Sequence, residues 1–553
     1  MNDTASALSA PAAPWPPVAL RQERHFGDRL LRCYAERPRH LPQMLQAAHA
    51  RAPQAAALVD GARRWNWTAL RGDSARLAHA LARLGVAAGD RVALLLGNRA
   101  EFVIATHAVL RLGAVLVPLS TREAAPGVAF ALNQCRATAL LADATLATLV
   151  PERLADGQAL QRIWLGDDTQ PGTPPDGWLS WHDLMAIKDD SPFGDASPAE
   201  DEAAVILYTS GTTGRPKGAV LTHLNLLHSV LHYRHALGLK HDDRALLAVP
   251  ASHVTGLVAI VLAMAGVGGT VVVLRAFKAA DCLALIDREK VSYTLMVPAM
   301  YALCLLEPTL AAVDLSGWRL AGFGGAPMPP TTIEGLRQHC AGMRLFNAYG
   351  ATETSSPATL TPPGAAPLDA VGVALPCADV RVVDDDGHDL PAGQSGEIWI
   401  AGPMVVPRYW DNPQATSDGF VAGYWKSGDI GTLDADGYLR VHDRKKDMIN
   451  RGGYKVFSVE VENCLLSHPA VQEAATVGVP CPVLGERIHA FVYAPDIASK
   501  AQLQVELVAR CRQQLADYKT PDAWTWLAEP LPRNPNGKVL KRALREQAAA
   551  SQK

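Results

Sequence analysis

Short apolar runs alternate with helix-like segments in the first third of the chain. Residues 92–96 have the pattern of a buried strand, residues 99–112 that of a helix stopped by Gly113, and residues 115–117 that of the next strand. A further apolar run at residues 139–141 follows another helical stretch. Strands separated by helices in this way are joined as parallel neighbours through right-handed crossovers. The pattern therefore predicts an α/β sheet.

The same alternation returns later in the chain, with candidate strands at residues 293–297 and 320–323. Beyond residue 371 the pattern changes to short alternating strands, such as residues 380–383 and 397–401. Short strands separated by tight polar turns are typical of antiparallel sheets. We expect a small barrel-like piece here.

Five consecutive charged residues at 443–447 separate this piece from a compact α+β region. A charge run is usually a solvated face, but the change of composition across this one supports an interdomain linker equally well. In the region that follows, Ser458 is expected to cap a helix. We therefore expect a large domain at residues 41–444 and a small one at residues 445–553.

Residues 256–274 contain no charged side chain and are long enough to be considered as a membrane span. Glycines at 266, 268 and 269 divide the segment into a helix-like half and a β-branched half. The second half has the composition and length of a strand. We expect a buried helix followed by a core strand, and no integral membrane segment.

Composition narrows the class of protein. A length of 553 residues exceeds what one hydrophobic core organises, so several subdomains are expected. The formal net charge of −3 provides no general attraction to nucleic acid, and no nucleic-acid partner is expected. The nine cysteines include no Cys-x-x-Cys pair, which fits a reducing compartment such as the cytoplasm. Residues 1–40 begin with an Ala- and Pro-rich stretch and are expected to be a disordered or loosely packed tail.

The most informative stretch is the loop at residues 208–218, which follows the apolar run 205–207. Glycines and successive N–H groups suit phosphate oxygens. It is not a Walker A loop, because Pro216 stands where that motif needs a glycine followed by lysine. A surface turn without a ligand would use the same residue types. The candidate phosphate-binding residues are Thr209, Ser210, Gly211, Thr212, Thr213, Gly214 and Lys217.

Five more motifs follow in order along the chain. The second is Pro250-Ala251-Ser252-His253-Val254-Thr255-Gly256, and the third is Gly324-Gly325-Ala326-Pro327. The fourth is Asn347-Ala348-Tyr349-Gly350-Ala351-Thr352-Glu353. The fifth is Ser427-Gly428-Asp429 with Arg444, and the sixth is Pro532-Arg533-Asn534-Pro535-Asn536-Gly537-Lys538. Each has an ordinary structural reading: His253 alone reads as a core histidine, and a lysine near the C-terminus is normally solvated.

Taken together, the six motifs resemble the ANL superfamily of adenylate-forming enzymes, from about residue 41 to 544. The resemblance implies an α/β fold: a large N-terminal domain of two α/β subdomains with parallel-rich sheets plus a small β-barrel-like subdomain, and a small mobile α+β C-terminal domain. It implies that Lys538, Glu353 and His253 are catalytic, with Glu353 as the Mg²⁺ ligand and His253 facing the acyl pocket. Implied ATP or AMP contacts beyond the phosphate loop are Gly325, Ala326, Pro327, Asn347, Ala348, Tyr349, Gly350, Thr352, Asp429 and Arg444. Lys446 is the implied hinge, and Gly452 and Gly453 would line the tunnel for coenzyme A.

The resemblance favours an acyl-CoA synthetase: an ATP-dependent carboxylic acid:CoA ligase that uses ATP, Mg²⁺ and coenzyme A and forms an acyl-adenylate. Val254 stands where amino-acid-activating members usually carry an Asp, which disfavours amino acids. Medium- or long-chain fatty acids are the first expectation, followed by aryl acids and then alicyclic acids. A stand-alone adenylation enzyme that loads a carrier protein, and a non-catalytic nucleotide-binding protein, are the alternatives. The oligomeric state stays open, a homodimer included.

Overall fold

The computed structural model describes residues 14–167, 172–187, 193–209, 216–340, 342–364, 366–497, 499–533 and 538–550. The chain forms two compact units. Unit 1 comprises residues 1–380, 400–426 and 436–439, and unit 2 comprises residues 381–399, 427–435 and 440–553. Unit 2 includes residues from both sides of the expected domain boundary at 444/445, and that boundary stays a prediction.

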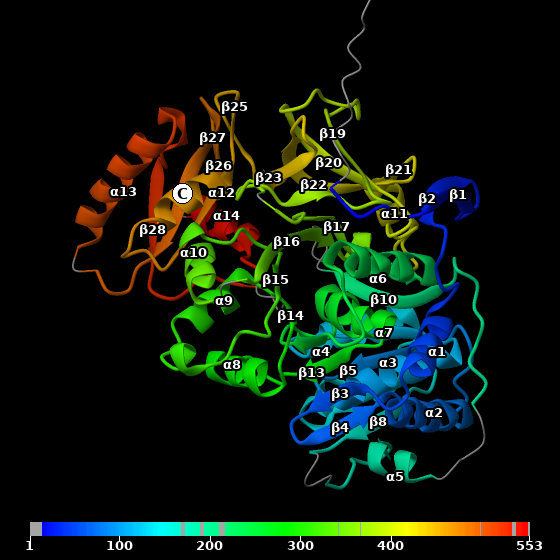
Figure 1. Ribbon diagram of the computed structural model, residues 1–553. Coiled ribbons are helices and arrows are strands. Elements are labelled where there is room, and N and C mark those ends of the chain that lie inside the picture. The colour runs from blue at the N-terminus through cyan, green and yellow to red at the C-terminus, as the bar shows by residue number, and fades with distance from the viewer. Residues whose placement is uncertain are drawn as a thin grey trace, which may run out of the picture. The chain divides into compact units, whose positions relative to one another are not determined.

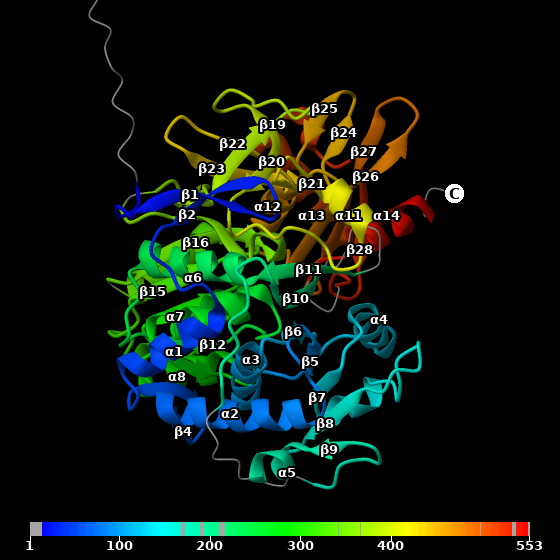
Figure 2. The same ribbon diagram turned by 90° about the vertical axis from the view of Figure 1, so that its right-hand side faces the viewer.

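The first sheet of unit 1 has seven strands in the order β11-β10-β6-β5-β7-β8-β9, which can be followed by their labels in Figure 2. All of its pairs are parallel except β10–β11. Helix α3 (Ala100–Leu112) follows β5 and ends at Gly113, whose φ of 76° lies in the left-handed region that favours glycine. The predicted parallel sheet is confirmed. The strands are β5 (Arg91–Leu95), β6 (Val115–Pro118), β7 (Ala139–Asp143), β8 (Gln161–Leu165), β9 (Leu179–Ser180), β10 (Ala203–Thr209) and β11 (Lys217–Thr222).

A second sheet in unit 1 runs β4-β3-β13-β12-β14-β15-β16 and continues into the antiparallel strands β17 and β18. The strands predicted near residues 293 and 320 are its parallel centre. The antiparallel pair β3–β4 was not predicted, because its short strands lie within an Ala-rich stretch that reads as helix. The bounds are β3 (Ala56–Asp60), β4 (Arg63–Asn66), β12 (Arg244–Leu247), β13 (Thr270–Val273), β14 (Tyr293–Met296), β15 (Leu320–Phe323), β16 (Arg344–Ala351), β17 (Ser356–Leu360) and β18 (Gly372–Ala374).

Helices pack around these sheets. Helices α1, α6 and α7 lie side by side (Figures 1 and 2). The helices of unit 1 are α1 (Leu41–Arg51), α2 (Trp67–Arg83), α3, α4 (Ala125–Cys135), α5 (Trp181–Ala186), α6 (His223–Leu237), α7 (Ala263–Val267), α8 (Ala279–Arg288), α9 (Pro298–Leu305), α10 (Pro330–His339) and α11 (Pro413–Gly419).

The uncharged segment at residues 256–274 folds as predicted. A π-helix, η2 (Thr255–Leu262), leads into α7, the chain turns at Gly268 with φ 76°, and β13 enters the core of the sheet. Almost all of these side chains are buried. Among the described residues, no helix combines the length and apolar composition that crossing a bilayer requires.

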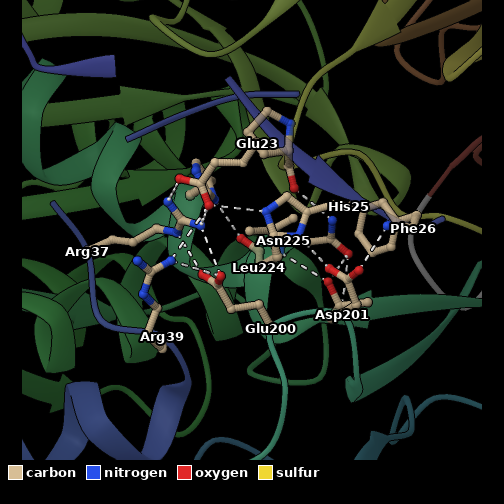
Figure 3. A network of polar contacts seen from close by, with 12 residues as sticks. Glu23, His25, Phe26, Arg37, Arg39, Glu200, Asp201, Leu224 and Asn225 are labelled. Carbon is tan, nitrogen blue, oxygen red and sulfur yellow. Dashed lines mark hydrogen bonds and ion pairs between the residues drawn. The ribbon is translucent and has the colours of Figure 1, made fainter. Parts of the chain in front are cut away.

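An N-terminal hairpin, β1 (Leu20–His25) and β2 (Arg29–Tyr34), precedes the first helix. The side chain of Arg37 is fully buried beside it and pairs at 2.7 Å with both Glu23 and Glu200, as Figure 3 shows. The hairpin is thereby attached to the segment that leads into β10. The expectation of a loose tail is therefore wrong for residues 20–34. These residues are held in place by ion pairs with distant residues, which the local sequence pattern does not reveal. Residues 1–13 lie outside the described residues.

Aromatic contacts add to this attachment. The ring of Tyr34 packs against three histidines of helix α6, with centroid distances of 5.7 Å to His228, 5.6 Å to His232 and 5.2 Å to His235. Burial lowers the pKa of His228 to about 3 and that of His232 well below the ordinary value. Neither ring nitrogen of His232 has a hydrogen-bond partner among the described residues. His228 and His232 are therefore neutral core residues, whereas His235 lies at the edge of the cluster and is only partly buried.

Unit 2 contains a sheet in the order β25-β24-β27-β26, with β28 parallel to β27. Helix α12 begins at Ser458 itself, so the expected capping role of Ser458 is wrong. The carboxylate of Asp443 accepts the Ser458 N–H at 2.5 Å and satisfies the helix start instead. The elements are β24 (Ile449–Arg451), β25 (Tyr454–Val456), α12 (Ser458–Leu466), β26 (Glu473–Cys481), β27 (Gly485–Tyr493), α13 (Lys500–Gln514), β28 (Ala523–Leu527) and α14 (Lys541–Ala550). Strands β19 (Asp379–Val383), β20 (Ser395–Ala401), β22 (Tyr424–Leu433) and β23 (Tyr438–Arg444) are divided between the units.

Candidate functional site

The predicted phosphate loop joins β10 to the antiparallel strand β11. Thr209 and Lys217 face each other as the last cross-strand pair, and the Thr209 hydroxyl donates to the Lys217 carbonyl at 3.4 Å. Gly218 is required here, because a Cβ would lie 2.9 Å from the Ile206 side chain. The loop between the strands includes Ser210, Gly211, Thr212, Thr213 and Gly214, which lie outside the described residues.

The third and fourth motifs meet at the carboxyl ends of β15 and β16. Phe323 pairs with Asn347, and a Cβ on Gly324 would lie 2.4 Å from the carbonyl oxygen of Ala348. The turn with Gly325, Ala326 and Pro327 therefore starts directly beside Asn347 and Ala348. Carboxyl ends of parallel strands are where α/β proteins place ligands.

The fourth motif continues from β16 into a single 3₁₀ turn, η4 (Thr352–Thr354). Tyr349 is half-buried, and Gly350 is exposed. A Cβ at Gly350 would lie only 1.6 Å from the carbonyl oxygen of Ser356, so no other residue can occupy this position without moving the backbone. This close approach brings the chain into the turn that carries Thr352 and Glu353.

The carboxylate of Glu353 is buried, with 8% of the residue exposed. Its Oε1 accepts a hydrogen bond from the Tyr409 hydroxyl at 2.8 Å. Burial, reinforced by the charge of Glu353, raises the pKa of Tyr409, so this hydroxyl remains a protonated donor. Among the described residues, no lysine, arginine or histidine forms an ion pair with Glu353. Buried carboxylates normally pair with a cation or ligate a metal, so Glu353 fits a divalent cation.

Tyr409 was not predicted from the sequence. Besides binding Glu353, its ring lies under the ammonium group of Lys217, with 5.2 Å between Nζ and the ring centroid. The sequence around Tyr409 matches none of the six motifs, and only the fold brings it to both residues.

Asp429 and Arg444 of the fifth motif come together within unit 2, with 2.7 Å between Arg444 Nε and Asp429 Oδ1. Gly428 adopts φ 68°, and the Asp429 N–H donates to the Ser427 hydroxyl at 2.9 Å. Asp429 is buried while the Arg444 side chain is 45% exposed. The pair presents a carboxylate and a guanidinium side by side.

The predicted catalytic lysine, Lys538, is exposed and lies three residues before helix α14. That helix is fixed to the charged segment at 443–447: Arg545 pairs with Asp447 at 2.5 Å and donates to the Lys446 carbonyl at 2.9 Å. Lys541 binds Glu462 at 2.7 Å. The segment of the predicted hinge thus contacts the helix that follows Lys538.

Gly452 and Gly453 form the turn between β24 and β25, with φ values of 61° and 87°. Each lies in the left-handed region, which favours glycine. A Cβ at Gly453 would meet nothing within 4 Å.

His253 of the second motif is exposed, so it is not a core histidine. Its N–H donates to the Pro250 carbonyl at 3.0 Å in a tight turn before η2. A Cβ at Gly256 would lie 2.3 Å from the same carbonyl oxygen, which explains the glycine that ends the motif.

Two protein-family profiles match this chain. The profile of the AMP-binding enzyme family matches residues 45–410, and that of the AMP-binding enzyme C-terminal domain matches residues 460–538. The chain belongs to the AMP-binding enzyme family. As an AMP-binding enzyme it is a member of the ANL superfamily, which confirms the family that the six motifs indicated and the expected class of AMP-forming acid–thiol ligase.

Named relatives of this AMP-binding enzyme differ in their acids. The long-chain-fatty-acid–CoA ligase FadD13 of Mycobacterium tuberculosis is 35% identical over 86% of this chain and 92% of its own. The feruloyl-CoA synthase of an Amycolatopsis species is 35% identical over 89% and 96%. The o-succinylbenzoate CoA synthetase of Bacillus subtilis, solved with ATP and a magnesium ion, has a TM-score of 0.78 at 31% identity and covers 91% and 98%. These similarities also confirm the expected α/β fold class.

Proposed function

We propose that this AMP-binding enzyme is an ATP-dependent carboxylic acid:CoA ligase acting on a medium- or long-chain fatty acid in the cytoplasm. The observation that carries the proposal is the buried Glu353 carboxylate, which accepts a hydrogen bond from Tyr409 and has no cation partner among the residues that the structure describes. The ring of the same Tyr409 lies under the ammonium group of Lys217. ATP suits a site that binds a divalent cation and phosphate and that lies beside the carboxyl ends of β15 and β16, where we expect adenine. The free state of all nine cysteines suits a reducing compartment.

In the first half-reaction a carboxylate oxygen of the acid attacks the α-phosphate of ATP, the bond to the bridging oxygen breaks, and pyrophosphate leaves. No protein nucleophile is needed, so the residues act by positioning and by stabilising charge. Lys538 offsets the charge shared between the carboxylate and the α-phosphate oxygens. Asp429 accepts hydrogen bonds from the ribose hydroxyls, and Arg444 donates to the same sugar.

Glu353 is the residue that would hold Mg²⁺, with Thr352 as the neighbouring hydroxyl. When bound, the ion neutralises charge that develops on the phosphate oxygens. The phosphate loop, with Thr209 and Lys217 at its two ends, supplies donors to the same oxygens. Tyr349 presents a flat ring suited to adenine.

In the second half-reaction the sulfur of coenzyme A attacks the acyl carbonyl carbon, and AMP leaves with its electron pair. A rotation about Lys446 would withdraw Lys538 and bring in the turn at Gly452 and Gly453, where two glycines leave room for the pantetheine arm. His253 is the residue that we assign to the acyl side of the site.

The residues that follow His253 bear on which acid the enzyme activates. The apolar η2 segment that follows His253 supports a nonpolar acyl group. Pyrophosphate release measured over a panel of fatty, aryl and alicyclic acids tests it. A medium- or long-chain fatty acid should give the highest kcat/KM; an aryl acid at the top of the ranking contradicts the fatty-acid proposal but not the reaction.

Substitution of Lys538 tests the reaction itself. We expect Lys538→Ala to abolish acid-dependent pyrophosphate release while thioester formation from a supplied acyl-adenylate continues. Release of ADP and phosphate in place of AMP and pyrophosphate contradicts the proposed function outright.

A further inference from the structure

Tyr409 is held rigidly at the site by its own surroundings. It is 5% exposed, its N–H donates to the Thr416 hydroxyl at 3.0 Å, and its backbone bridges to Ala219 of strand β11. Its ring packs against Phe420 with 5.6 Å between centroids. A side chain fixed on the backbone and on the ring can aim its hydroxyl in one direction only.

The segment before Tyr409 is fixed as well. The side-chain amide of Asn225 donates to the carbonyls of Pro403 at 2.7 Å and Val405 at 3.0 Å. The next residue, Val406, donates its N–H to the backbone carbonyl of Glu353 at 2.9 Å. Glu353 is therefore attached to this segment twice, through its backbone and through its carboxylate.

The Tyr409 hydroxyl binds one carboxylate oxygen of Glu353, Oε1. The other oxygen, Oε2, forms no hydrogen bond or ion pair with a described residue. A neutral hydroxyl donor fixes the orientation of a carboxylate without cancelling its charge, as outer partners of metal ligands do. The ring of Tyr409 also lies under the ammonium group of Lys217, the cation at the end of the phosphate loop.

We propose that Tyr409 is a positioning residue that orients the carboxylate of Glu353 toward a divalent cation and keeps Lys217 in place at the end of the phosphate loop. Tyr409 itself touches neither the cation nor the reacting atoms. The inference rests on the proposed function only in taking the cation to be the one that accompanies ATP.

The variant Tyr409→Phe removes one oxygen and keeps the ring under Lys217. Loss of an outer partner typically weakens metal binding 10- to 100-fold, so we expect the Mn²⁺ dissociation constant of the full chain to rise by about 10-fold. Titration of the protein with Mn²⁺, followed by electron paramagnetic resonance, measures this without turnover. The Mg²⁺ concentration that gives half-maximal pyrophosphate release should rise in parallel, with the KM for the acid unchanged.

Tyr233→Phe is the matched control. Tyr233 is also buried, and its hydroxyl forms a hydrogen bond with the Ser356 hydroxyl at 2.7 Å. Both variants should lose similar thermal stability, but only Tyr409→Phe should weaken Mn²⁺ binding, and Glu353→Gln should weaken it further. Equal Mn²⁺ affinity in Tyr409→Phe and Tyr233→Phe overturns the inference. Wild-type protein that releases no pyrophosphate with any acid, yet still shows this difference in Mn²⁺ affinity, would overturn the proposed function instead.

Discussion

The guanidinium of Arg444 contacts the carboxylate of Asp429 at 2.7 Å, and the two side chains differ sharply in exposure. Asp429 is buried at the end of a tight glycine turn, whereas Arg444 reaches toward solvent. An ion pair with so much exposed guanidinium contributes little to stability. The Asp429–Arg444 pair instead presents a hydrogen-bond acceptor and a hydrogen-bond donor side by side.

Asp429→Ala should therefore affect ATP far more than folding. Hydrogen bonds to a charged acceptor are worth about 1.5–3 kcal/mol, so the kcat/KM for ATP should fall roughly 10- to 100-fold. Steady-state pyrophosphate release at varied ATP measures this. Asp434→Ala is the control, because Asp434 also pairs with an arginine of unit 2, Arg440, at 2.7 Å. If Asp434→Ala lowers the kcat/KM for ATP by a comparable factor, the loss in Asp429→Ala comes from a general disturbance of unit 2 and not from a lost contact with ATP.

Arg545 should matter for catalysis although it lies seven positions beyond Lys538. Without its contacts to Asp447 and the Lys446 carbonyl, helix α14 can shift, and small misplacements of a catalytic group cost up to about 100-fold in rate. We expect Arg545→Ala to lower kcat for adenylate formation by about 10-fold or more.

Arg542→Ala supplies the control on the same helix, because the exposed Glu546 is the one ion-pair partner of Arg542 among the described residues. It should leave kcat unchanged. The double variant Arg545→Asp/Asp447→Arg, which exchanges the two charges, should recover part of the lost rate. If Arg542→Ala lowers kcat as much as Arg545→Ala does, and the double variant recovers nothing, α14 does not position Lys538.

Gly350→Ala should disrupt the site, because its Cβ would overlap the Ser356 carbonyl oxygen and displace the turn that carries Glu353. We expect pyrophosphate release to fall at least 100-fold. Gly72→Ala is the contrasting change: Gly72 lies within helix α2, where a Cβ meets nothing within 4 Å. Alanine there should stabilise the fold by about 0.5–1 kcal/mol, measured by urea denaturation.

Stability should fall as the pH drops below about 6.5. Burial lowers the pKa of His107, His223 and His228 to about 3, and it lowers the pKa of His232 well below its ordinary value. The unfolded chain binds protons below its histidine pKa of about 6.5 while these native histidines do not, so acid favours unfolding. Each contributes up to about 1.4 kcal/mol per pH unit.

Urea denaturation between pH 7.5 and 5 measures this slope above the range in which carboxylates titrate. His232→Phe should make the slope shallower and should not destabilise the protein at pH 6, because both ring nitrogens of His232 lack partners among the described residues. An unchanged slope would mean that His232 gains a proton in the native state.

Sequence patterns predicted the features that depend on neighbouring residues. The strand at Leu320–Phe323 and the helix stop at Gly113 are confirmed, because burial periodicity and glycine conformation are local properties. Motif order also indicated the family. The roles assigned to Lys538 and Lys446 stay predictions.

Contacts between distant segments were not predictable in the same way. Tyr409 and Glu353 are 56 residues apart, and nothing in either local sequence specifies their hydrogen bond. The prediction for the start of helix α12 was wrong for a related reason. Serine is a residue type that often caps helices, but at Ser458 the capping carboxylate comes from Asp443 in the preceding strand β23.

The N-terminal hairpin has a practical consequence for fragment design. Sequence similarity to the family begins at residue 45, so a shortened protein that starts there keeps all six motifs and still loses Glu23, Arg37 and Tyr34. Glu200 would then lack its buried cation, and the histidine face of helix α6 would be open to water and to protons. Such a fragment should be prone to aggregation even though every residue assigned to catalysis is present.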